Sequence, residues 1–188
     1  CLDVAERMQT AAAGDSLGRL VVIGLGLIGG SFAKGVREAH LFSEVVGVDL
    51  DSESCRLAVE LGVVDRCETD LARACQGAAV IQLAVPILAM ERLLEQLSAL
   101  DLHSTILTDV GSAKGSILRA AQRYLPQCLA NFVPGHPIAG SEQSGVEAAD
   151  AALFRRHKVI LTPHAAVDTA ALALVERLWR ALGADVEH

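Results

Sequence analysis

The sequence predicts an α/β fold in which helices cover both faces of a doubly wound, mostly parallel sheet. Short runs rich in Val, Ile and Leu alternate along the chain with longer segments of helical character. Continuous apolar runs of this kind are typical of strands buried on both faces, and their alternation with helices implies right-handed crossovers. The first run is followed at once by glycines spaced G-x-G-x-x-G, and 188 residues suit one sizeable domain of this class.

The first part of the chain contains two strand–helix units. Residues 19–23 are a β-branched run that ends at the glycines, and a helix is expected over residues 31–39. Residues 45–48 form the second apolar run. The polar residues that begin at Asp51 are typical of a helix start and predict a helix over residues 55–61.

The alternation continues to the end of the chain. Further strands are expected at residues 80–84, 105–108, 129–133 and 158–162, with helices from Pro86 to about residue 97 and over residues 114–124 and 168–182. Residues 1–17 lie outside this pattern and are expected to be a helical or disordered lead-in. The predicted division is therefore a lead-in over residues 1–17 and one domain over residues 18–188.

Composition narrows the possible partners. A formal net charge of −7 argues against nucleic acid and anionic membranes, and an aromatic content of 3% argues against base-stacking surfaces. The longest apolar run, residues 20–30, contains four glycines and is too short to span a bilayer. No signal peptide is expected, because residues 1–18 carry charges and lack an apolar core.

Cysteine and histidine usage predicts a reduced protein without a metal. The five cysteines are an odd number without a C-x-x-C pair, so neither a disulfide framework nor a zinc site is expected, and a cytoplasmic location follows. His157 and His164 flank the last expected strand, but no nearby carboxylate or cysteine completes a ligand set with His136.

The glycine turn over residues 24–29 has the spacing and the context of a Rossmann-type dinucleotide-binding loop. Gly24 permits the tight turn, Gly26 lets the backbone approach a pyrophosphate, and Gly29 lets the helix lie close to the strand. The amides of Leu27 and Ile28 would then face the phosphates. The alternative is a glycine-rich turn that only packs two elements together.

Asp49 indicates which cofactor this loop would hold. It lies at the end of the second strand, twenty residues after Gly29. A carboxylate there can accept hydrogen bonds from an adenosine ribose, whereas a 2′-phosphate would meet like charge. Leu50 and Asp51 supply no compensating arginine. We therefore expect NAD rather than NADP.

His136 is the candidate catalytic residue. It is held between Gly135 and Pro137 in an expected loop after an apolar strand. Histidine titrates closest to neutrality among the side chains and suits a general base. The alternative is a surface histidine without a chemical role. The nucleotide-binding pattern of the rest of the chain favours the first interpretation, since the ligand crevice of such a domain would receive this loop.

Several motifs together resemble the prephenate dehydrogenase family of tyrosine biosynthesis. They are the glycine loop with Asp49, the Ala-Val-Pro turn at 84–86, the Asp-Val-Gly-Ser-Ala-Lys turn at 109–114, and Gly-His-Pro-Ile-Ala-Gly at 135–140. The last two are specific to the family in combination, and the likeness covers roughly residues 19–188. By position, the resemblance makes His136 the base that contacts the substrate's ring hydroxyl and Ser112 the serine that orients both. It places Glu142 at the mouth of the pocket and Val85 and Pro86 beside the cofactor.

The implied activity is the NAD-dependent oxidative decarboxylation of prephenate to 4-hydroxyphenylpyruvate. Members of the family continue with a helical second domain that dimerises and binds the substrate's carboxylates. That domain is expected to be absent here, and the full-length protein is expected to be a homodimer. Alternatives are an arogenate-using enzyme, a related hydroxyacid dehydrogenase that relies on a lysine, and a catalytically silent NAD-binding module. Lys114 is either a surface lysine at a helix start or a residue of the pocket.

Overall fold

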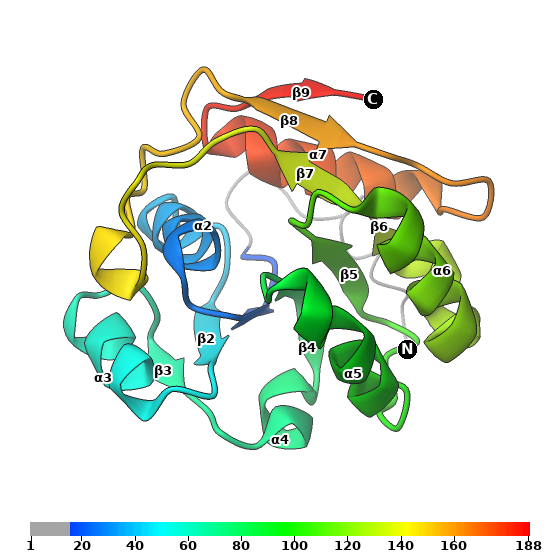
Figure 1. Ribbon diagram of the computed structural model, residues 1–188, viewed down its shortest axis with the longest axis horizontal. Helices are drawn as coiled ribbons and strands as arrows, with labels where there is room; N and C mark the ends of the chain where they lie inside the picture. Colours follow the sequence, from blue (N-terminus) through cyan, green and yellow to red (C-terminus); the bar gives the residue numbers. More distant parts are fainter. Residues whose placement is uncertain (1–15) are drawn as a thin grey trace.

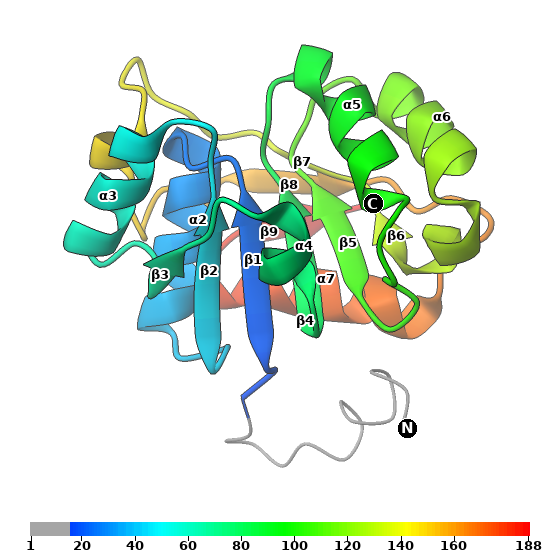
Figure 2. The same cartoon turned by 90° about the horizontal axis from the view of Figure 1, so that it is seen from below.

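The computed structural model describes residues 16–188, and its main sheet has six parallel strands in the order β3-β2-β1-β4-β5-β6. The strands are β1 (Arg19–Ile23), β2 (Glu44–Val48), β3 (Arg66–Cys67), β4 (Ala78–Leu83), β5 (Ile106–Asp109) and β6 (Phe132–Val133). The strand β1 lies between β2 and β4 (Figure 2). Val21 of β1 is opposite Val46 on one side and Ile81 on the other. The predicted doubly wound α/β fold is confirmed.

Helices cover both faces of this sheet (Figure 1). One face packs against α2 (Leu27–Glu38), α3 (Ser52–Glu60) and α7 (Thr169–Ala181), and the other packs against α4 (Leu71–Cys75), α5 (Ile87–Leu97) and α6 (Lys114–Tyr124). Alternate residues of β1 serve the two layers, since Leu20 and Val22 join the first cluster and Val21 and Ile23 the second. No helix in residues 16–188 is long and apolar enough to cross a membrane.

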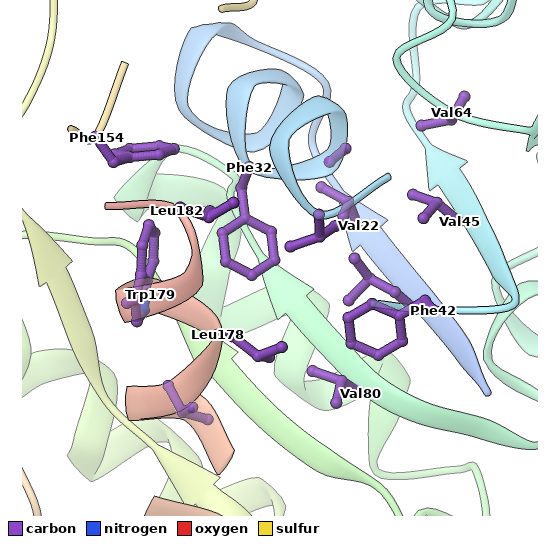
Figure 3. Close-up of a cluster of buried hydrophobic side chains, with 14 of the residues drawn as sticks. Val22, Phe32, Phe42, Val45, Val64, Val80, Phe154, Leu178, Trp179 and Leu182 are labelled. Atoms are coloured by element: carbon purple, nitrogen blue, oxygen red, sulfur yellow. The ribbon is translucent and has the colours of Figure 1, made fainter. Parts of the chain in front are cut away.

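The aromatic centre of the first layer is Trp179 of α7 (Figure 3). Its ring makes edge-on contacts with Phe32 of α2, at a centroid distance of 4.8 Å, and with Phe154, at 4.9 Å. All three side chains are fully buried. Trp179 therefore joins the helix after the glycine turn to the last third of the chain.

A second, three-stranded sheet carries the histidine. It consists of β7 (Gly135–Pro137), β8 (Lys158–Leu161) and β9 (Asp185–Glu187); β8 runs antiparallel to β7 and parallel to β9. The short 3-10 helix η2 (Val146–Ala148) lies between β7 and β8. The expected loop around His136 is thus wrong, because this residue is the middle of a short strand. The strand expected at residues 158–162 is present as β8, but outside the main sheet.

Other differences from the sequence prediction have local causes. Helix α2 begins at Leu27, earlier than expected, because Gly26 serves as its N-cap, and Gly29 and Gly30, which disfavour helix, lie within it. The strand expected at residues 129–133 is reduced to β6, because the 3-10 helix η1 (Pro126–Asn131) occupies the preceding residues. The short elements β3 and α4 were not predicted. Of the expected lead-in, residues 1–15 lie outside the described residues.

The prediction of reduced cysteines is wrong for one pair. Cys55 of α3 and Cys67 of β3 form a disulfide, with their Cα atoms 5.6 Å apart. The two residues are 12 positions apart in the sequence, and the helix returns the chain to the sheet edge so that they meet. An odd cysteine count and the lack of a C-x-x-C motif carry no information about such a contact through space. Cys75 and Cys128 are buried thiols.

Candidate cofactor and catalytic site

The glycine turn between β1 and α2 combines two crowded glycines with an open one. Gly24 has a φ of +96°, and a Cβ there would lie 2.4 Å from the carbonyl oxygen of Ala84. A Cβ on Gly29 would lie 2.0 Å from the carbonyl oxygen of Gly24. At Gly26, by contrast, a Cβ would meet no described atom within 4 Å. Gly24 and Gly29 are therefore required by the protein's own packing, and Gly26 leaves room beside the turn for a ligand.

Helix α2 presents its first amides at this turn. Gly26 is the N-cap and supplies no side-chain cap, and the first turn contains no acidic residue. The N–H groups of Leu27 and Ile28 belong to that turn, where a helix has no acceptors of its own. A helix N-terminus carries partial positive charge and binds anions. The turn can therefore hold a phosphate group.

Asp49 follows β2 and lies against the glycine turn. Its Oδ2 accepts a hydrogen bond from the N–H of Leu25 at 2.8 Å, and its Oδ1 accepts one from the N–H of Asp51 at 2.9 Å. The turn is also tied to β2 directly, since Gly24 N–H donates to the carbonyl of Val48 at 2.8 Å. These bonds orient a half-buried carboxylate that retains acceptor capacity for a ligand hydroxyl.

The turn after β4 forms the other wall. Ala84 N–H donates to the carbonyl of Ile23 at 2.8 Å, so this turn and the glycine turn touch. Val85 is half-buried and Pro86, the N-cap of α5, is exposed. The strand order reverses between β1 and β4, and ligands of open α/β sheets bind at the carboxyl ends of strands at such a point.

A buried ion pair that the sequence analysis did not identify lies at the end of β5. Asp109 is fully buried; its carboxylate pairs with the Lys114 ammonium and accepts hydrogen bonds from the N–H groups of Gly111, at 2.8 Å, and Gly135, at 3.2 Å. Lys114 also donates to the carbonyl oxygen of Gly135 at 2.6 Å. Burial raises the pKa of Asp109 above its ordinary value, and the charge of Lys114 offsets part of that rise. Burial also lowers the pKa of Lys114 below its ordinary value. The sequence feature that could have indicated this ion pair is an aspartate at the end of an apolar strand.

These bonds bring the predicted catalytic residues to one edge of the sheet. Ser112 lies in the exposed turn between Asp109 and Lys114, and His136 directly follows Gly135, which the ion pair holds. His136 is partly exposed, but its Nδ1 is buried and has no hydrogen-bond partner among the described residues. Within residues 16–188, no hydrogen bond joins Ser112 to His136, and the exposed Glu142 bonds to neither. The structure thus ties the segments that carry Ser112 and His136 to the same ion pair, with no hydrogen bond between the two side chains.

Comparison with known proteins identifies the family. Residues 32–188 match the family described as prephenate dehydrogenase, nucleotide-binding domain. The chain belongs to this family. The matched residues begin within α2 and do not include the glycine turn. The assignment of that turn to a cofactor therefore rests on its geometry. The family resemblance predicted from the motifs is confirmed.

Three relatives are each longer than the part that this chain matches. A prephenate dehydrogenase of Lactococcus lactis subsp. cremoris is 40% identical over 145 residues, which are 77% of this chain and 40% of the relative. The crystal structure of prephenate dehydrogenase from A. aeolicus with hydroxyphenyl propionate and NAD+ is 34% identical, with a TM-score of 0.85 over 93% of this chain and 60% of that one. Synechocystis arogenate dehydrogenase is 33% identical, with a TM-score of 0.81 over 90% and 58%. The chain spans about half the length of these relatives.

Proposed function

We propose that the protein is an NAD-dependent prephenate dehydrogenase of tyrosine biosynthesis and that this chain is its cofactor and catalytic-histidine domain. The observation that supports this most directly is the attachment of Gly135, next to His136, to the turn that contains Ser112. That attachment lies at the carboxyl edge of the sheet, where the glycine turn also opens. The family match and the relative solved with NAD+ support the same activity.

The glycine turn fits a dinucleotide. The open side of Gly26 and the first amides of α2 suit a pyrophosphate, with Leu27 and Ile28 as donors. Asp49 would accept hydrogen bonds from the adenosine ribose, and Val85 and Pro86 would lie beside the nicotinamide. Gly24 and Gly29 maintain the shape of the turn. NAD supplies the electron acceptor that takes a hydride from the substrate's ring carbon.

The chain's own residues handle the proton and the position of the substrate. In the proposed reaction His136 withdraws the proton from the ring hydroxyl, and Ser112 orients that hydroxyl and the imidazole. Glu142 lies in the exposed segment after β7, at the proposed mouth of the pocket. The oxidised ring loses carbon dioxide because that step makes it aromatic, so 4-hydroxyphenylpyruvate is the product.

Arogenate is the second candidate substrate. The similarity to an arogenate dehydrogenase of Synechocystis supports it, and another relative is named cyclohexadienyl dehydrogenase. The two substrates share the ring hydroxyl that His136 would deprotonate and differ in the side chain, which carries an amino group in arogenate and a keto group in prephenate. Residues that contact this amino or keto group would set the substrate preference. The proposed roles of His136 and Ser112 are the same for either substrate.

The deciding experiment compares the intact protein with its His136→Asn variant. NADH formation is followed by absorbance with prephenate and with arogenate, and NAD binding is measured by calorimetry. We expect turnover of the variant to fall by about two to four orders of magnitude, the usual contribution of acid–base catalysis, with unchanged NAD affinity. Ser112→Ala should lose less, because it removes one orienting hydrogen bond and leaves the base. Near-normal turnover of His136→Asn would show that the base lies elsewhere, and inactivity of the unmodified protein with both substrates would favour a silent NAD-binding module.

A homodimer in the cytoplasm is the assembly and location that we propose for the intact protein. The acidic, NAD-linked character of the domain agrees with a cytoplasmic enzyme. The Cys55–Cys67 disulfide argues in the other direction, since disulfides are rare in that compartment. Trapping thiols in lysed cells and analysing the linked peptides would show whether this pair is oxidised there.

A further inference from the structure

The backbone of β7 leaves the polar groups of Gly135 without partners in its own sheet. Ile138 N–H donates to the carbonyl of Lys158, and Thr162 N–H donates to the carbonyl of Pro134. Hydrogen-bonded pairs alternate along an antiparallel ladder, so they fall at residues 134, 136 and 138. Gly135 and Pro137 are the alternate positions, whose backbone groups point away from β8. Pro137 has no N–H to satisfy, but Gly135 has both a donor and an acceptor.

Gly135 is buried, so these two groups need partners within the protein. The Asp109–Lys114 pair provides both, because Asp109 accepts from the Gly135 N–H and Lys114 donates to the Gly135 carbonyl. That carbonyl belongs to the peptide bond between Gly135 and His136. The lysine therefore orients the peptide plane that leads into the Cα atom of His136.

The same ion pair holds the turn that contains Ser112. Asp109 accepts from the N–H of Gly111, and the carbonyl of Ser112 accepts from the N–H of Lys114. Space at this joint is limited as well, since a Cβ on Gly135 would lie 3.0 Å from the carbonyl oxygen of Asp109. One buried carboxylate and one ammonium thus connect the main sheet, the serine turn and the histidine strand.

We propose that Asp109 and Lys114 are positioning residues that fix the His136 imidazole relative to Ser112 and the glycine turn. This inference rests on the proposed function, because it assigns the pair a role through His136. The pair acts on the backbone beside the base and not on the substrate. Its loss should displace the base while the cofactor site, built on β1, β2 and β4, stays as it is.

The test is a double-mutant cycle in the intact protein, with Lys114→Met made in the wild-type and in the His136→Asn background. In the wild-type background we expect kcat to fall about 10- to 100-fold, the effect of a misplacement of about 1 Å, with unchanged NAD affinity and full binding stoichiometry. In the His136→Asn background we expect Lys114→Met to change kcat less than about threefold, because the base it positions is already absent. Lys114→Arg, which keeps the charge and the donors, should recover most of the lost turnover.

The matched control is Lys158→Met, which removes an exposed lysine of β8 paired with Glu187 and should leave kcat unchanged. If unpaired Asp109 prevents Lys114→Met from binding NAD stoichiometrically, the neutral variant Asp109→Asn/Lys114→Met carries the same cycle without a buried lone charge. Equal losses in both backgrounds would overturn the inference and would mean that Lys114 contacts the substrate itself. If His136→Asn alone retains turnover, it is the proposed function that fails, and the two failures are thereby distinguished.

Discussion

The glycines of the nucleotide turn have different physical reasons to be glycine. Gly29 is enclosed by the protein, since an added Cβ would lie 2.0 Å from the Gly24 carbonyl oxygen and 2.9 Å from the Ala84 methyl group. Gly26 has a φ of −77°, which any residue can adopt, and nothing surrounds its hypothetical Cβ. The packing of the protein itself favours glycine at position 29, and only a ligand would favour glycine at position 26.

This difference predicts opposite results for two alanine substitutions. Gly26→Ala should change the free energy of unfolding by no more than about 1 kcal/mol, the usual effect at an N-cap, while weakening NAD binding at least tenfold. Gly29→Ala should lower stability by more, because backbone must move to admit the methyl group. Urea unfolding and calorimetric titration with NAD measure the two effects. Wild-type NAD affinity in Gly26→Ala would contradict the placement of the pyrophosphate.

We expect the preference for NAD over NADP to depend on one residue, Asp49. Its carboxylate accepts hydrogen bonds from the N–H groups of Leu25 and Asp51, and the residues that follow it, Leu50 and Asp51, include no lysine or arginine. We expect the unmodified chain to bind NAD more tightly than NADP, and Asp49→Ser to narrow or invert that preference by removing the repulsion of a 2′-phosphate. Calorimetric titrations with both cofactors provide the measurement. Equal affinities in the unmodified chain would refute the assignment.

Among the elements, those with a self-contained pattern were predictable and those that depend on distant partners were not. The runs at β1, β2, β4 and β5 are mostly apolar, because most residues on both faces of each strand are buried. The three-residue strand β7 contains a glycine and a proline, and only its pairing with β8, more than twenty residues away, makes it a strand. Asp109 and Lys114 occupy a recognisable turn motif, but the residue to which both bond, Gly135, lies in another element. Their pairing around Gly135 could not be predicted from spacing.

The edge of the main sheet is fastened by one carboxylate shared between neighbouring strands. Glu44 of β2 pairs with Arg19 of β1 at 2.6 Å and with Arg66 of β3 at 2.7 Å. The hydrogen bond from Arg66, together with the contribution of Arg19, lowers the pKa of Glu44 below its ordinary value despite partial burial. A lowered folded-state pKa stabilises the fold above the unfolded-state pKa, and this stabilisation is lost as pH falls through the folded-state value.

We therefore expect Glu44→Gln to destabilise the protein at neutral pH by about 0.5–1.5 kcal/mol, the range for two partly exposed ion pairs. The difference from wild type should shrink as the pH falls below the ordinary glutamate pKa, because the wild-type carboxylate then becomes protonated. Urea unfolding at a series of pH values measures it. Glu95→Gln, on the exposed surface of α5, is the control and should show no such pH-dependent difference. A pH-independent loss in Glu44→Gln would indicate a packing effect instead.

On the scale of the whole molecule, the histidine sheet is joined to the main sheet at two places of different character. One is the polar joint at Gly135. The other is the apolar cluster in which Val159 and Leu161 of β8 and Trp179 of α7 pack with Val22 and Val80 of the main sheet. In our proposal the first joint orients His136, and the second supplies the buried area that keeps the small sheet in place. Because the cluster is continuous, the two sheets should unfold together.

Trp179 is the residue on which that continuity depends most. Trp179→Ala removes the largest fully buried side chain and, with it, the ring that contacts both Phe32 and Phe154. We therefore expect it to lower the free energy of unfolding by about 3–5 kcal/mol. Trp179→Phe should cost less, because it retains an aromatic ring and removes an indole N–H that is buried without a partner among the described residues. Urea unfolding followed by circular dichroism and by hydrogen exchange at β1 and β8 measures both variants. In wild type we expect one transition shared by both strands. Exchange of β8 amides well before those of β1 in the unmodified protein would show instead that the small sheet is a separate cooperative unit, held mainly by the ion pair at Gly135.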